Sequence, residues 1–201
     1  MPDFSYETDA KSRGYNIVCG VDEAGRGPLA GPVCAAAVIL PENCVIDGLN
    51  DSKKLSEKKR EALFTVIKQK VIAYSIAFAG VEEIEKFNIL NATYLAMNRA
   101  VEGLEIKPDI AFIDGNRVPV NAPVFCETII KGDLKSYSVA AASVLAKVSR
   151  DRLMFEYDKK YPEYGFAAHK GYGTKAHYEA IEKFGICEIH RLSLIHISEP
   201  T

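Results

Sequence analysis

Three short apolar segments of the sequence end in a carboxylate, and this recurrence most constrains what the chain can fold into. The segments run into Asp22 and Glu23, into Asp114 and into Asp133, and a glycine or other small residue stands beside each acid. Short apolar runs bounded by turn residues are typical of buried strands, and strand ends in one sheet are rigid platforms. We therefore expect one sheet whose strand ends bring these acids together.

The remaining pattern places strands early in the chain and helices late. Apolar runs predict strands over residues 15–21, 33–40, 71–79, 110–114 and 124–130. Helical spacing predicts a helix capped by Ser56, one along 90–104, one over about 136–161 and one over 174–184. Because strands and helices do not alternate strictly, α/β and α+β both stay open, around one mixed sheet.

Two of these helices have faces that the sequence defines. The long helix carries small residues that would let it approach a sheet closely: Ala140, Ala141, Ala142 and Ala146. Its other face is a polar stripe made of Ser136, Ser143, Lys147 and Arg150. The last helix is expected to turn Ala180, Ile181 and Phe184 inward and to stop at Gly185.

Composition excludes several classes of protein. The 201 residues carry 25 Lys and Arg against 27 Asp and Glu, a net charge of −2, so no global basic character indicates a polyanionic partner. The chain is 48% hydrophobic, with a mean hydropathy of −0.04, which fits a globular protein with one substantial core. The longest apolar runs, 33–40 and 139–146, are too short to span a membrane.

The N-terminus and the cysteines indicate the cytoplasm. Residues 1–9 include acids where a secretory signal needs bases followed by an apolar stretch. The five cysteines are widely spaced and form no C-x-x-C pair, so we expect reduced, mostly buried thiols. The pair Cys187 and His190 resembles half a zinc site, but no second pair accompanies it.

The acids at the strand ends suit metal-dependent chemistry. Carboxylates held within a few ångström repel one another and must take up protons or bind cations. A site rich in oxygen ligands suits Mg²⁺ or Mn²⁺, and two such ions about 3.5–4 Å apart support in-line displacement at phosphorus. The alternative is that each acid is only a turn former or a helix cap, to which Asp133, directly before a helix, is most open.

Longer motifs around these acids point to one family. Residues 19–33 read CGVDEAGRGPLAGPV, which closely resembles the signature of ribonuclease HII. Further motifs follow in that family's order: DSKKLS at 51–56, FIDGN at 112–116, KGD at 131–133, SVAAASVLAKV at 138–148, YGF at 164–166 and HKGYGT at 169–174. The resemblance covers residues 15–191. Ribonuclease HIII, a relative with an extra N-terminal domain, fits less well because only about 14 residues precede the first expected strand.

The resemblance implies an α/β ribonuclease H-like fold, with a mixed central sheet flanked by helices and a helical C-terminal part. It implies an endoribonuclease that cuts 5′ to a ribonucleotide in RNA/DNA hybrids and in duplex DNA with embedded ribonucleotides, leaving 3′-hydroxyl and 5′-phosphate ends. Two Mg²⁺ or Mn²⁺ ions would be the cofactors, and a monomer without membrane contacts is expected. The catalytic and metal-binding residues carried over are Asp22, Glu23, Asp114 and Asp133, with Asp22 bridging both ions.

Selectivity for a ribonucleotide requires groups that read the 2′-hydroxyl. The resemblance assigns this task to Gly25, Arg26, Gly27 and Tyr172. A dinucleotide-binding loop is the alternative for these glycines, but Pro28 and the two preceding acids fit it badly. Contacts to the nucleic-acid backbone are expected from two groups of basic and polar residues. The first group is Lys53, Lys54, Lys58, Lys59 and Arg60, and the second, on the long helix, is Ser143, Lys147 and Arg150. A solvated helix face is the alternative for residues 58–60.

The last ten residues depart from the family pattern. Residues 192–201 read LSLIHISEPT, which looks like the translation of a transposase adapter used in preparing sequencing libraries. Our hypothesis is a non-native tail on a catalytic domain over 15–191, with residues 1–14 as an N-terminal extension; a genuine divergent tail is the alternative. Because the family pattern is cut short, a catalytically idle duplex-binding protein is the alternative function.

Overall fold

The computed structural model describes residues 2–49 and 55–195, and its centre is a mixed sheet of five strands. The strands are β1 (Val18–Ala24), β2 (Val33–Ile39), β3 (Ala73–Ala79), β4 (Ile110–Asp114) and β5 (Phe125–Ile129), in the order β3-β2-β1-β4-β5. β1, β4 and β5 run parallel to one another, whereas β2 is antiparallel to both β1 and β3. The mixed α/β sheet expected from the sequence is thus confirmed.

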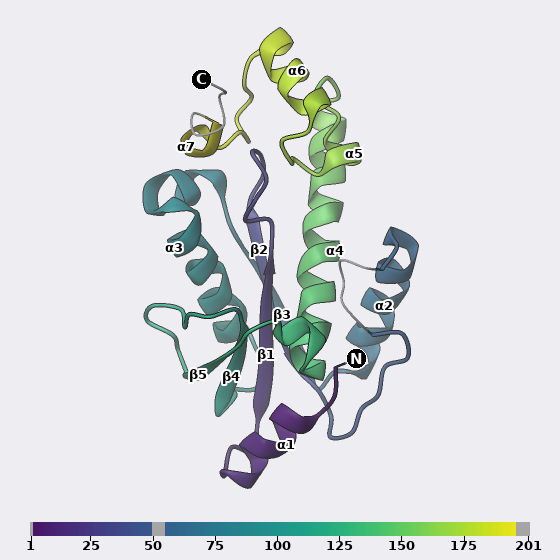
Figure 1. Cartoon of the computed structure of the whole chain (residues 1–201), viewed down its shortest axis with the longest axis vertical. Helices are drawn as coiled ribbons and strands as arrows, with labels where there is room; N and C mark the ends of the chain where they lie inside the picture. Colours follow the sequence, from purple (N-terminus) through teal and green to yellow (C-terminus); the bar gives the residue numbers. More distant parts are fainter. Residues whose placement is uncertain (1, 50–54, 196–201) are drawn as a thin grey trace.

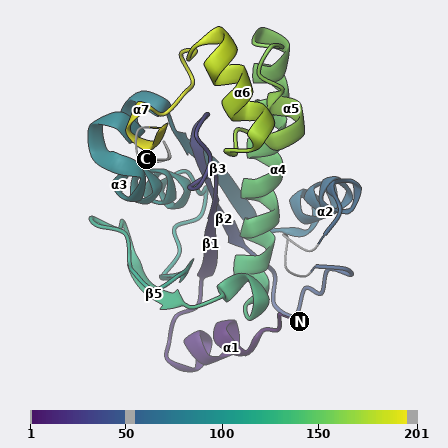
Figure 2. The same cartoon turned by 45° about the horizontal axis from the view of Figure 1, so that its top comes forward.

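Helices cover both faces of this sheet, as Figure 1 shows. Their bounds are α1 (Ser5–Ser12), α2 (Glu57–Lys70), α3 (Val81–Glu102), α4 (Tyr137–Lys160), α5 (Phe166–His169), α6 (Lys175–Phe184) and α7 (Leu192–Ile195), with a 3₁₀ turn, η2, at Gly132–Leu134. α3 packs on one face and α4 on the other, where α2 lies beside it. In Figure 2, α5 and α6 lie side by side at one end of the molecule, and α7 lies against α3.

The register of β1 places Asp22 and Glu23 inside the strand rather than after its end. Pairing with β4 ends at Val21 opposite Ile113, but pairing with β2 continues to Ala24 opposite Cys34. The antiparallel partner therefore extends β1 beyond the run expected at 15–21. Asp22 and Asp114 follow directly after the last β1–β4 pair, so their backbones come level at the same end of the sheet.

The long helix lies very close to β1, as its small residues predict. A Cβ added to Gly20 would stand 2.2 Å from the backbone nitrogen of Val139, so only glycine fits beneath the first turn of α4. Ala140, Ala141, Ala142 and Ala146 are fully buried. Ser136 caps the helix by accepting a hydrogen bond from the Val139 N–H.

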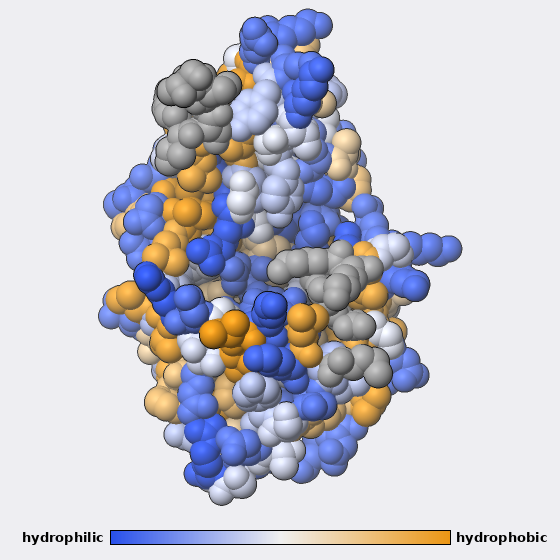
Figure 3. Space-filling view, in the orientation of Figure 1, coloured by the Kyte–Doolittle hydropathy of each residue, from blue (hydrophilic) through white to orange (hydrophobic). Residues whose placement is uncertain are grey.

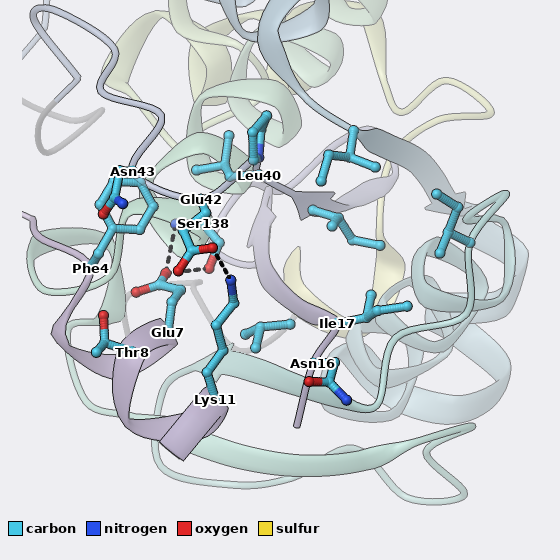
Figure 4. Close-up of a pocket in the computed structure, with 15 residues that line it drawn as sticks. Phe4, Glu7, Thr8, Lys11, Asn16, Ile17, Leu40, Glu42, Asn43 and Ser138 are labelled. Carbon is cyan, nitrogen blue, oxygen red and sulfur yellow. Dashed lines mark hydrogen bonds and ion pairs between the residues drawn. The ribbon is translucent and has the colours of Figure 1, made fainter. Parts of the chain in front are cut away.

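The N-terminal segment folds into α1, which the sequence pattern did not predict. Glu7 of α1 accepts hydrogen bonds from the hydroxyls of Ser136 and Ser138, each at 2.6 Å, and from the Ser138 N–H at 3.0 Å. Figure 4 shows the bonds between Glu7 and Ser138 beside a cavity that is also lined by the ion pair between Lys11 and Glu42, 3.1 Å apart. α1 is therefore fixed to the beginning of α4, at the opposite end of the sheet from Asp22.

Other expectations are settled by the described residues. Phe184 is half exposed, so its expected inward position is wrong. α6 lies at the edge of the molecule, where the Phe184 ring meets Tyr164 in a T-shaped contact and the Nζ of Lys183 lies over it. All five cysteines are free. Each helix in the described ranges falls short of the length or the apolar character that a membrane crossing requires. Figure 3 shows the polar and apolar side chains interspersed over the face seen in Figure 1.

Candidate active site

Three of the four predicted acids meet where β1 and β4 end. Asp22 is buried and accepts a hydrogen bond of 2.7 Å from the N–H of Glu23. Asp114 accepts a hydrogen bond of 2.6 Å from the N–H of Gly132. The turn after β5 is thereby attached to the end of β4.

Burial and neighbouring negative charges raise the proton affinity of Asp22 and Glu23. The pKa of Asp22 lies well above its ordinary value because of burial and of the negative charges of Glu23 and Asp114, although a hydrogen bond from Ser143 opposes the change. Burial also raises the pKa of Glu23, against the pull of Arg26, whose Nη1 lies 3.3 Å from its Oε1. Without a counter-charge, Asp22 and Glu23 cannot both be ionised at low cost.

This donor set fits a hard divalent cation. Its ligands are all oxygen, and Oε2 of Glu23 is buried without a hydrogen-bond partner in the structure. Among residues 2–49 and 55–195, no three or more His, Cys, Asp or Glu side chains are arranged so that they could hold a metal ion. Mg²⁺ commonly completes its coordination with water and substrate phosphate, so an open set of carboxylates suits it.

Asp133 lies in η2, the 3₁₀ turn that is hydrogen-bonded to Asp114. It is buried in η2, directly after Gly132, whose N–H binds Asp114. Lys131, at the start of this turn, has a left-handed backbone with φ of +57°. The structure therefore puts Asp133 on the segment nearest Asp114, and its part in metal binding stays a prediction.

The residues expected to read the substrate share a cavity with the first two acids. Asp22 and Glu23 line it together with Gly25, Arg26, Gly27, Ser143, Lys147 and Tyr172. Tyr172 is 45% exposed, and a Cβ added to Gly27 would stand 3.5 Å from its ring. Lys147 pairs at 2.7 Å with Asp151. Segments more than 140 residues apart in sequence thus form one site.

Not every expected contact to nucleic acid lies in this cavity. Lys53 and Lys54 fall outside the described residues. Lys58 and Lys59 are exposed on α2 and do not line the cavity, and Arg60 is half buried, with a hydrogen bond to the Leu55 carbonyl.

The expected role of Arg150 is wrong. This side chain is 1% exposed, and its guanidinium donates to the carbonyls of Pro32 at 2.9 Å, Ala30 at 3.0 Å and Lys170 at 2.9 Å. Helical spacing placed it correctly on the stripe with Ser143. It could not show that the β1–β2 loop and the C-terminal segment close over that end of the helix.

A second buried arginine, which the sequence reasoning missed as a site residue, supports the same loop. Arg191 is fully buried and donates to the carbonyls of Gly25 at 2.6 Å, Pro28 at 2.8 Å and Gly31 at 2.7 Å. Five N–H donors in a fixed fork suit an arginine to such a bundle of carbonyls. The only signal in the sequence was its position within the family-like His190-Arg191 pair.

A second cavity lies on the other side of Glu23. It is lined by Glu23, Arg26 and Asp114, by the exposed Asn116 and Arg117 after β4, and by α3 residues that include Thr93 and Tyr94. Asn116 and Arg117 were not selected as site residues, although they follow the strand-end acid directly. Their polar and cationic side chains stand beside the carboxylates.

Comparison with known proteins identifies the family. The family model described as ribonuclease HII matches residues 19–197. The chain is 57% identical to ribonuclease HII of Acetivibrio thermocellus, over 94% of this chain and 73% of that protein. It is 55% identical to ribonuclease HII of Caldicellulosiruptor bescii, over 96% and 93% respectively. The crystal structure of ribonuclease H2 from Pyrococcus horikoshii superposes with a TM-score of 0.73 at 28% identity, covering 90% of this chain and 96% of that one.

Proposed function

The chain belongs to the ribonuclease HII family, and on that premise we propose that it hydrolyses the phosphodiester 5′ to a ribonucleotide, in RNA/DNA hybrids and in duplex DNA with embedded ribonucleotides. The observation that carries the proposal is the single cavity that joins Asp22 and Glu23 to Gly25–Gly27 and Tyr172. Such a cavity sets a phosphodiester-cleaving acid cluster beside groups suited to a sugar.

Asp22, Glu23, Asp114 and Asp133 would hold two divalent cations, Mg²⁺ or Mn²⁺. When bound, such ions activate water and stabilise the leaving oxygen, which gives 3′-hydroxyl and 5′-phosphate ends. The protein's part is to keep the carboxylates in place. The Glu23 N–H bond to Asp22 and the Gly132 N–H bond to Asp114 do this.

The substrate walls would be supplied by the β1–β2 loop and by Tyr172. Glycines at 25 and 27 leave backbone groups open to a sugar, and an exposed tyrosine ring offers a flat surface to the neighbouring deoxyribose. Ser143 and Lys147, on α4, line the same cavity and would supply a hydroxyl and a cation to a phosphate of the substrate. Arg26 and Lys53 complete the proposed contacts to the duplex.

The test is cleavage of a DNA duplex containing one ribonucleotide, with Mg²⁺ or with EDTA. We expect metal-dependent cleavage on the 5′ side of the ribonucleotide, and a loss of at least about 100-fold for Asp22→Asn, because a neutral amide is a poor ligand for Mg²⁺. Asp47→Asn, at an exposed aspartate away from the cavity, is the matched control and should cut like the wild type.

Two results would contradict the proposal. Binding of the duplex without metal-dependent cleavage by the wild type would support a catalytically idle duplex-binding protein. Equal cleavage by Asp22→Asn and wild type would remove Asp22 from the site.

A further inference from the structure

Three histidines lie together behind the Tyr172 turn, outside the catalytic cavity. The rings of His169 and His177 are stacked, with centroids 4.4 Å apart, and those of His177 and His190 are 5.2 Å apart. His177 is fully buried and His190 is 3% exposed, against the aromatic ring of Phe166. Buried imidazoles need defined partners for both ring nitrogens.

The partners of these rings define one hydrogen-bonded chain. The N–H of Cys187 donates to Nδ1 of His190 at 2.9 Å, so the proton of the neutral ring belongs on its Nε2. That nitrogen lies 3.1 Å from Nε2 of His177, to which it donates. Nδ1 of His177 then carries a proton and donates to the carbonyl of Tyr172 at 2.9 Å. The assignment follows from the network and leaves both rings neutral.

This chain of bonds ends on a backbone that is also joined to the β1–β2 loop. The N–H of Leu29 donates to the carbonyl of Gly171 at 2.8 Å. A Cβ added to Gly171, whose φ is +84°, would stand 2.6 Å from the carbonyl oxygen of Ala30. Arg191, the residue after His190, holds the same loop through the carbonyl of Gly25. Residues 190 and 191 therefore support opposite walls of the cavity, one through His177 and one directly.

We propose that His177 and His190 are positioning residues for ribonucleotide recognition, because they fix the Tyr172 carbonyl and so hold the Tyr172 ring over the β1–β2 loop. The inference rests on the proposed function, in which Tyr172 contacts the sugar. Neither histidine touches the cavity, so each acts only through the Tyr172 turn.

The surroundings keep the pair neutral, as its hydrogen bonds require. Burial lowers the pKa of His177 to about 4, and the neighbouring His169 and His190 act in the same direction. The pKa of His190 is lowered for the same reason. The other titratable groups against His190 are the Cys187 thiol, whose Sγ is 3.2 Å from Nδ1, and Tyr164, whose ring meets it edge-on. Neither group is a carboxylate, whose negative charge would stabilise a protonated imidazole.

The experiment uses two amide variants that separate the two ends of His177. In His177→Asn the amide nitrogen can take the place of Nδ1 and still donate to the Tyr172 carbonyl. In His177→Gln the amide reaches toward His190 instead, and the Tyr172 carbonyl loses its donor. We expect kcat for a single-ribonucleotide duplex to fall about tenfold in the Gln variant and less than about threefold in the Asn variant. KM should change little, because the phosphate contacts are untouched.

The effect should disappear when Tyr172 is removed. In a Tyr172→Ala background, His177→Gln is expected to cause no further loss, whereas a merely structural role would lower activity in both backgrounds. Circular dichroism and thermal melting confirm that each variant is folded. Equal activity of the Gln and Asn variants, or a full additional loss in the Tyr172→Ala background, would overturn the positioning role. Undiminished cleavage by Tyr172→Ala alone would instead count against the proposed function of Tyr172.

Discussion

At the residue scale, Asp22 is a buried carboxylate beside two others, Glu23 and Asp114, whose negative charges act on it. Its charge therefore costs stability when no cation is present. We predict that in EDTA the Asp22→Asn variant is more stable than the wild type by about 1–2 kcal/mol of unfolding free energy, and that it therefore melts at a higher temperature. The amide removes the charge but keeps the hydrogen bond from the Glu23 N–H. Adding Mg²⁺ should stabilise the wild type and have little effect on the variant. A lower melting temperature for the variant in EDTA would show that repulsion among the carboxylates does not limit the stability of the metal-free protein.

Tyr172 is exposed enough to be changed without disturbing the core. Because its ring faces Gly27 and lines the cavity, we predict that Tyr172→Ala reduces cleavage at a single ribonucleotide by about 100-fold or more, through lost substrate orientation. Tyr172→Phe keeps the ring and should retain most of the activity. Melting temperatures of both variants are expected to match the wild type. Unchanged activity of Tyr172→Ala would remove this residue from the site.

At the scale of elements, the contact between α4 and β1 sets the position of Asp22 relative to Ser143. Gly20 lies two residues before Asp22, and a side chain there would collide with the backbone of Ser138 and Val139. We predict that Gly20→Ala lowers the free energy of unfolding by about 3 kcal/mol or more, as measured by urea denaturation. Gly80→Ala is the control, because its added Cβ meets no atom within 4 Å, and it should change stability by less than about 1 kcal/mol. Similar losses in both variants would contradict the close approach.

The elements that the sequence predicted are those with a strong local pattern. Apolar runs and helical spacing identified the five strands, α4 and α6 within a few residues of their ends, whereas α3 begins at Val81, nine residues before the helix expected from residue 90. α1 was not predicted, because it is short and because the hydrogen bonds that hold it join Glu7 to Ser136 and Ser138, about 130 residues further along the chain. Arg150 was placed on the correct face of α4 but given the wrong role. Periodicity along one helix carries no information about the segments that later fold over it.

At the scale of the whole molecule, the candidate site combines acids that the sequence pattern identifies with supporting residues that lie far from them in the sequence. The acids at 22 and 114 could be predicted because strand ends in one sheet converge. The support for the β1–β2 loop could not be predicted, because Arg191 bonds to Gly25 and Gly31, which lie 160 residues or more before it in the sequence. Motif resemblance selected Tyr172 without indicating what holds it. The net charge of −2 likewise says little about the proposed nucleic-acid binding, since cations held by the acids would reverse the local field.

The buried histidines also make the stability of the whole molecule depend on pH. In the unfolded chain His177 has an ordinary pKa near 6.5, whereas in the folded protein it is about 4. Between these values the unfolded state binds a proton that the folded state does not, so stability falls as pH drops from about 6.5 to about 4 and then levels off. The gap corresponds to at most ~3 kcal/mol, and His190 adds a contribution of the same sign. We predict that His177→Asn, which keeps a donor to Tyr172 but cannot titrate, shows a shallower decline in urea midpoint across this range. Parallel curves for the two proteins would mean that His177 takes up its proton equally in the folded and unfolded states.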